Sequence, residues 1–202
     1  MSKAQQSFMP RHSSGESPRQ ARFKIRDNGL GFSPITIALH WIVAALALSI
    51  IALKLAHSID PAWGSIRYVN LFGTLLFPLS IYRFWARITS WHPLPVGTPN
   101  PVEVIVSRSV AVALALAMVL LPIAAWLAKS SAGQPIELPG EIFVPAILSV
   151  HPGAAHVFDV LFDIGASAFV CGLALHIFGA LKNHFVLKND SLKRMLGKHV
   201  EL

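Results

Sequence analysis

The chain alternates between four long apolar runs and shorter polar segments. The runs extend from about Ser33 to His57, Arg67 to Arg87, Val104 to Leu127 and His156 to Lys182. A helix needs about 20 predominantly apolar residues to cross the hydrocarbon core of a bilayer. The first run approaches that length without a charge, from Ile35 to Leu53. The pattern therefore predicts an all-α integral membrane protein, a bundle of four helices.

Local signals mark where these helices begin and where they are interrupted. The first run opens with Ser33-Pro34, which suits a serine N-cap followed by proline at the first helical position. The second run contains Pro78, which a membrane helix tolerates when neighbouring groups satisfy the freed carbonyl. Between the third and fourth runs, residues 129–153 hold several glycines and prolines. We expect a long loop there.

The two ends of the chain differ from its middle. Residues 1–32 are rich in Ser, Gln, Arg and Pro and show no apolar period, which predicts a disordered basic tail. Residues 188–202 are again polar and basic, and we expect a second tail there. This division leaves residues 33–187 as one transmembrane domain of four helices.

Composition supports the membrane assignment. Of the 202 residues, 53% are hydrophobic and only 13% are charged, whereas soluble domains carry about 25% charged residues. The formal net charge of +7 lies mostly in the tails, so we predict no nucleic-acid partner. The single cysteine, Cys171, excludes an internal disulfide and any metal site built from several cysteines.

The distribution of basic residues predicts the orientation. Fourteen Lys and Arg residues flank the tails and the middle connector, against three beside the other two loops. Basic residues concentrate on the cytoplasmic side of membrane helices, so both termini should face the cytoplasm. The first apolar run follows a long polar tail, an order unlike that of a cleavable signal peptide. We therefore expect the first helix to remain as an anchor.

Two of the nine histidines lie inside apolar runs, where an ionisable side chain is costly and indicates function. His40 and His176 are each about six residues from the expected cytoplasmic end of their run, roughly 9 Å deep. Two imidazoles at one depth, on helices of opposite direction, can bind one metal from both sides, as haem iron requires. The alternative is a pair of neutral histidines, each hydrogen-bonded to a neighbouring helix.

A second pair on the opposite membrane face is less well supported. His57 and His156 lie near that face, but His156 precedes His176 by 20 residues. At about 100° per residue the two side chains point roughly 200° apart around the helix. His156 therefore faces away from the side of the helix that carries His176.

Stretches in all four apolar runs match one family pattern. They are Leu39-His40-Trp41; Gly73 with Arg83, Arg87 and Pro93; Leu121-Pro122 through Trp126-Leu127 and Ser130 to Pro135; and Ala174-Leu175-His176 with Ala180 to Phe185 and Asp190 to Met195. The chain from Ser33 to Gly197 resembles the bacterial cytochrome b561 family. Its members are four-helix membrane electron carriers that exchange electrons with quinone, so the resemblance implies a cytochrome b domain over residues 33–187 in the bacterial cytoplasmic (inner) membrane.

The resemblance also implies which cofactor sites are present. The family usually holds two haems on four histidines, and His40 and His176 match the cytoplasmic pair as iron ligands. The other two ligand positions fall 14 residues before Arg83 and 14 before His176, on Val69 and Phe162. Neither side chain can bind iron. We therefore predict a variant with one haem b, lacking the haem on the far side.

Further contacts follow from the same comparison. Arg83 and Arg87 are candidate partners of the haem propionates, or snorkelling side chains that meet lipid phosphate. His184 lies about 12 Å beyond His176 along the helix, where it is a candidate quinone contact or an interfacial histidine without a substrate.

Three functions remain open at this point. The first is electron transfer to or from quinone on the cytoplasmic side. The second is an accessory or structural subunit of a larger membrane complex, with haem absent or redox-silent. The third is a transporter with a proton relay through Asp159 and Asp163, although inverted repeats are not evident. The expected partners are quinone, membrane lipid, and a redox partner protein or larger complex.

Overall fold

The computed structural model describes residues 32–61, 65–89, 100–189 and 191–197, and its architecture is all-α as predicted. Its long helices are α1 (Pro34–Ile59), α2 (Ile66–Thr89), α3 (Pro101–Ser131) and α4 (Pro152–Leu181). A π-helical turn, η1 (Lys182–Val186), continues α4, and a short helix, α5 (Ser191–Met195), follows it. The only strands in this part of the chain are β1 (Ile136–Glu137) and β2 (Phe143–Val144).

Side chains cap the start of three long helices, each of which has proline in its first turn. Ser33 Oγ accepts a hydrogen bond from the Thr36 amide at 3.2 Å, which confirms the predicted start of α1. Asn100 Oδ1 accepts from the Val102 amide at 2.9 Å. These caps satisfy amide groups that the first turn of a helix leaves unpaired.

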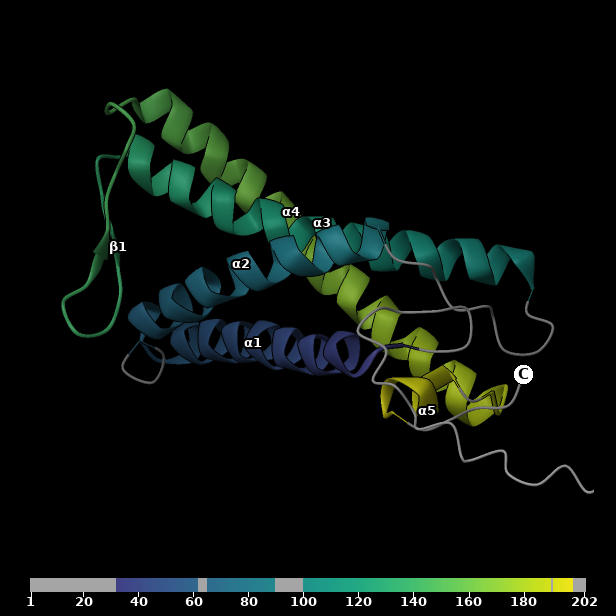
Figure 1. Ribbon diagram of the computed structural model, residues 1–202. Helices are drawn as coiled ribbons and strands as arrows, with labels where there is room; N and C mark the ends of the chain where they lie inside the picture. Colours follow the sequence, from purple (N-terminus) through teal and green to yellow (C-terminus); the bar gives the residue numbers. More distant parts are fainter. Residues whose placement is uncertain (1–31, 62–64, 90–99, 190, 198–202) are drawn as a thin grey trace, which may run out of the picture.

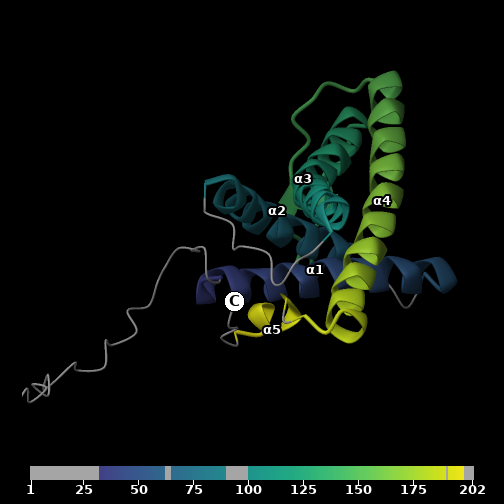
Figure 2. The ribbon, with the colours of Figure 1, turned by 90° about the vertical axis from the view of Figure 1, so that its right-hand side faces the viewer.

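The long helices form two pairs, α1 with α2 and α3 with α4. The α3–α4 pair crosses the α1–α2 pair at a wide angle (Figures 1 and 2). Glycines bring α3 and α4 together: a Cβ atom on Gly165 would lie 3.0 Å from Leu121 Cδ2, and one on Gly172 3.4 Å from Leu114 Cδ2. Small residues at such contacts allow close backbone approach in membranes.

Three segments of the described chain are long and apolar enough to cross a membrane: α1, α3, and α4 continued by η1. Large apolar side chains such as Trp41 and Phe178 are exposed on these helices, as expected for helices in lipid. The α2 helix has a similar length but carries three arginines, at 67, 83 and 87, and it does not meet the same criterion. The prediction of an all-α membrane protein is confirmed.

The connection between α3 and α4 is more ordered than the predicted loop over 129–153. α3 extends into it as far as Ser131, and β1 and β2 form an antiparallel hairpin within it. Ser130 Oγ accepts hydrogen bonds from the amides of Ile147 at 2.6 Å and Leu148 at 2.9 Å. The predicted long loop is therefore confirmed, but it begins after Ser131 and contains a hairpin, and Ser130 at the end of α3 holds the returning backbone.

Other predictions concern segments that the structure describes only in part. The predicted tail over residues 1–32 lies almost wholly outside the described residues, as does the proline-rich connector over 90–99. Within the predicted C-terminal tail over 188–202, the structure places α5. This helix contacts α4 and η1, so that part of the segment folds back on the membrane domain.

Candidate functional site

The structure brings the rings of His40 of α1 and His176 of α4 together in an edge-on, T-shaped arrangement. Their ring centroids are 6.3 Å apart, and the ring planes are inclined at 62°. Both side chains are half-buried. Around this contact α1 and α4 pack little on each other, because α1 lies along α2 and α3 lies along α4. The two imidazoles therefore meet where the α1–α2 pair and the α3–α4 pair cross.

Arg83 of α2 lies at the same site. Its Nη2 atom is 2.7 Å from Nδ1 of His40. Its Nη1 atom is buried and has no hydrogen-bond partner among the described residues. A buried guanidinium donor without an acceptor is costly, so the site can still accept an anionic or carbonyl oxygen beside the histidine pair.

Arg87 lies one helical turn beyond Arg83, near the end of α2, and is half-buried. Residues four positions apart share a helix face, so both guanidinium groups project from the same side of α2. The site thus combines two imidazoles with a local excess of positive charge.

His184 lies in η1, two turns beyond His176, and is half-buried. Its ring is 4.9 Å from the Phe185 ring. Among the described residues, no hydrogen bond or ring contact joins it to His40 or His176. A π-helical turn rotates the side chains that follow it and is frequent at functional sites. The structure places His184 just beyond the C-terminal end of α4, apart from the histidine pair.

One contact at this end was missed by the sequence analysis. The indole Nε1 of Trp41 donates a hydrogen bond of 2.9 Å to the Met195 carbonyl of α5. Trp41 follows His40 directly, and their ring centroids are 5.5 Å apart. A tryptophan at a membrane interface favours a partner for its N–H, but nothing local in the sequence identifies a carbonyl 154 residues away.

Comparison with known proteins identifies the family. The family model described as prokaryotic cytochrome b561 matches residues 31–198. A relative, cytochrome b561 homolog 2 of Escherichia coli (strain K12), is 31% identical over 172 residues, which covers 83% of this chain and 92% of the relative. The chain belongs to the prokaryotic cytochrome b561 family. It is thus a bacterial membrane protein of a family of b-type cytochromes that bind haem and take part in electron transfer.

At the opposite end lie Val69 and Phe162, the two positions that the sequence analysis assigned to a second pair of haem ligands. Val69 of α2 is buried, with 9% of its surface exposed. Phe162 of α4 is half-buried, and Lys54 Nζ of α1 lies 5.4 Å from the centroid of its ring. A cation over an aromatic face is a favourable contact. In the described part of the chain, no group of three or more His, Cys, Asp or Glu residues could hold a metal ion.

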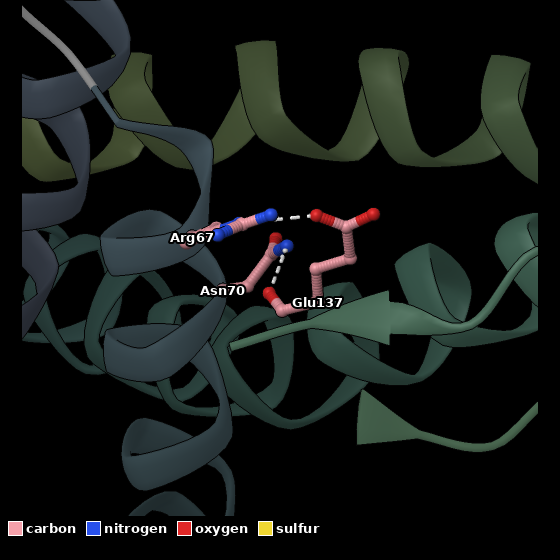
Figure 3. A network of polar contacts seen from close by, with 3 residues as sticks. All are labelled: Arg67, Asn70 and Glu137. Atoms are coloured by element: carbon pink, nitrogen blue, oxygen red, sulfur yellow. Dashed lines mark hydrogen bonds and ion pairs between the residues drawn. The ribbon is translucent and has the colours of Figure 1, made fainter. Parts of the chain in front are cut away.

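Polar side chains close to Val69 in the sequence hold the hairpin (Figure 3). Asn70 Nδ2 donates a hydrogen bond of 2.9 Å to the Glu137 carbonyl. Arg67 Nε donates to Glu137 Oε2 at 3.1 Å in an exposed ion pair. In this cytochrome b561 protein, the start of α2 is therefore joined to β1.

Proposed function

We propose that this cytochrome b561 protein holds one haem b between His40 and His176 and carries electrons to or from quinone on the cytoplasmic side. One observation carries the proposal: the two imidazole rings lie next to each other, edge-on, with centroids 6.3 Å apart. An imidazole nitrogen binds a transition metal at about 2.0 Å, so two rings on one metal have centres roughly 6 Å apart. The separation suits axial ligation from both sides.

The surroundings of the pair also suit a haem. The wide crossing of the helix pairs (Figure 2) limits direct packing of α1 on α4, and Arg83 offers a buried donor toward an oxygen ligand. When bound there, haem would supply a one-electron redox centre, and His40 and His176 would be the residues that hold its iron. Burial and hydrogen bonds to the two histidines would tune its potential.

Arg83 has two mutually exclusive roles in this proposal. Arginine only donates hydrogen bonds, so in the observed contact Nδ1 of His40 accepts and the ring proton resides on Nε2. A histidine that binds iron through Nε2 carries its proton on Nδ1 and donates it. Iron ligation by His40 therefore requires Arg83 to release Nδ1. The freed guanidinium, with Arg87 one turn away, is suited to pair with a propionate.

The count of one haem rests on the far end of the molecule. Val69 and Phe162 stand at the two positions that would need histidine, and neither side chain can ligate iron. The Lys54 contact with the Phe162 ring and the bonds from Asn70 and Arg67 to Glu137 occupy polar groups in this region. Both partners of one site are lost together, while both partners of the other are present.

The quinone side of the proposal rests on position and charge. His184 is the histidine of η1 and lies eight residues after His176, and its ring could exchange a proton with a quinone at the interface. Its neighbours Phe185 and Val186 are exposed, 68% and 69%, where lipid-dissolved quinone can reach them. We propose a haem-to-quinone path at this end, with lipid headgroups around it.

The orientation follows from the basic residues near the helix ends, and it remains our proposal. The N-terminal tail over 1–32 and the segment after residue 187 would both lie in the cytoplasm, with the protein in the cytoplasmic membrane. The hairpin of β1 and β2 would then face the periplasm. The haem would lie closer to the cytoplasmic face, so a partner protein would be needed to pass electrons across the full membrane.

The test is the haem content of the purified full-length protein in detergent. A pyridine haemochrome assay should give one haem b per chain. His40→Ala and His176→Ala should each lose it, because each substitution removes one of the two proposed iron ligands. His156→Ala is the control, since this exposed histidine lies on the same helix as His176 and should leave the haem in place. Two haems in the wild type, or full haem in either ligand variant, would contradict the proposal.

A structural role in a larger complex is the second candidate, and the exposed hairpin loop favours it. Ile142, Phe143 and Ile147 are 60%, 55% and 58% exposed on a segment tied to α3 and α2. An exposed apolar patch on an ordered loop suits a protein partner. Stoichiometric co-purification of a second membrane protein, with no haem absorbance from this chain, would favour this function over electron transfer.

A further inference from the structure

The two helices that carry the histidine pair have little direct packing to fix their separation. α1 lies along α2, and α4 along α3, while His40 and His176 meet at the crossing of the two pairs. A change in the crossing would alter the distance between the imidazoles directly. A connection between α1 and the end of α4 would therefore control the geometry of the pair.

The chain after α4 turns back toward α1. The Leu187 amide bonds to the Lys182 carbonyl at 3.1 Å, and the Asn189 amide bonds to the Asn183 carbonyl at 3.0 Å. Between them Lys188 adopts a φ of 51°, a left-handed conformation that is uncommon for a residue other than glycine. This turn reverses the chain at the end of the π-helical segment and leads it into α5.

α5 reaches α1 at the residue next to the histidine. Figures 1 and 2 both show α5 beside the first turns of α1, and the Met195 carbonyl accepts the hydrogen bond from Trp41 Nε1 at 2.9 Å. The preceding residue, Arg194, is only 6% exposed. Burial of an arginine at this level is rare for a loose terminal segment, so α5 is packed in a defined place.

We propose that α5 is a strap that joins the end of α4 to α1, and that Trp41 is a positioning residue for His40 through this strap. The strap contacts α4 and η1 on one side and bonds to Trp41 on the other. The strap therefore connects α1 and α4, the two helices that carry His40 and His176. The positioning role rests on the proposed function, in which His40 and His176 hold one haem.

The test compares Trp41→Phe with Trp85→Phe in the full-length, haem-loaded protein in detergent. Phenylalanine keeps a ring at position 41 but removes the N–H donor. Trp85 is a matched control because it is 64% exposed on α2, and its indole makes no hydrogen bond within the described part of the chain. A hydrogen bond of ordinary strength corresponds to a factor of about two to ten in an equilibrium constant.

Two haem readouts and one independent readout are measured. The transfer of haem to apomyoglobin should be about twofold to tenfold faster in Trp41→Phe, and the reduction potential and low-spin electron paramagnetic resonance signal should change. The independent readout is a nitroxide label at Leu196→Cys, an exposed position next to Met195, with Cys171→Ser to remove the exposed native thiol. Its spectrum should show greater mobility in Trp41→Phe and no change in Trp85→Phe.

Each outcome decides one part of the proposal. An unchanged label in Trp41→Phe would overturn the strap. A mobile label with unchanged haem transfer, potential and spectrum would overturn the positioning role of Trp41. If Trp41→Phe does not fold, Arg194→Gln is tested by the same readouts, because it loosens α5 through a different side chain. Retention of haem in His40→Ala would instead contradict the proposed function, and the label in the haem-free protein would still decide the strap.

Discussion

The two ends of the helix assembly use their polar side chains differently. At the end that carries the histidine pair, His40, His176 and Arg83 converge from three helices, and one buried donor of Arg83 has no partner in the described chain. At the other end, Asn70 and Arg67 are both engaged with Glu137. The first arrangement leaves a buried arginine donor without an acceptor among the described residues. In the second, the polar side chains bond to the hairpin.

Under the proposed function, the far end lacks the two histidines that a second haem would need. Nearby groups at that end form other contacts. A cation–aromatic contact involves Phe162 itself, and a link to the hairpin lies next to Val69. The two halves of one fold thereby come to differ in chemistry while keeping the same helices.

The strongest test of the difference between the two ends is to place histidines at positions 69 and 162. We expect Val69→His with Phe162→His to raise the haem content from one toward two per chain, because both ligand positions are then filled. A Cβ atom built on Gly73, one turn after Val69, would meet no atom within 4 Å, so there is open space nearby. The pyridine haemochrome assay measures the content, with each single variant as control. A content that stays at one would mean that the far end has closed around its new contacts.

A smaller effect is expected from Arg83→Gln. The substitution removes one charge-assisted contact to His40 in the haem-free protein and the proposed contact to a propionate in the loaded one. An arginine–carboxylate pair is the stronger of the two, so haem retention should fall about tenfold. Competition with apomyoglobin measures it, and Arg67→Gln is the control from the other end of α2. Equal retention in both variants would exclude a contact between Arg83 and the cofactor.

Asn70→Ala should loosen the hairpin without affecting the haem. It removes one hydrogen bond to the Glu137 carbonyl, which costs about 1 kcal/mol. Glu137→Gln breaks only the exposed ion pair with Arg67 and should cost less, since such pairs contribute about 0–1 kcal/mol. Hydrogen exchange of the amides in β1 and β2 reports the difference. Loss of haem from Asn70→Ala would show that the two ends are coupled.

The smallest effect is expected from Lys54→Met. The substitution keeps a long apolar side chain near Phe162 and removes the cation over its ring, which is worth about 0.5–1 kcal/mol at an exposed site. Thermal unfolding in detergent should shift by a few degrees at most. The haem content should remain unchanged, and Lys129→Met serves as a control on a different helix. A large loss of stability would indicate that Lys54 has a further partner at the far end.

The elements of the fold could largely be predicted because the membrane simplifies their pattern. Uncharged runs and a Ser33-Pro34 start predict α1 closely, since a helix in lipid must satisfy its own backbone groups. The ends of α3 and the hairpin of β1 and β2 were missed. Their order depends on hydrogen bonds from the returning backbone to Ser130, and no local pattern in the sequence identifies such a partner.

The candidate site, too, could be predicted from the sequence only in part. Apolar neighbours single out His40 and His176, because an ionisable side chain at that depth is costly without a function. Equal depth then predicts that the two could meet. Depth does not report where Arg83 points, and its contact with Nδ1 of His40 depends on how α2 lies against α1.

The sequence by itself determined the membrane class, the helical elements and the two histidines, since each depends on polarity and spacing along one segment. Only the tertiary structure decided the crossing of the helix pairs, the contact of Arg83 and the return of α5 to Trp41. Those features join residues from separate segments, and their geometry depends on the packing of whole helices.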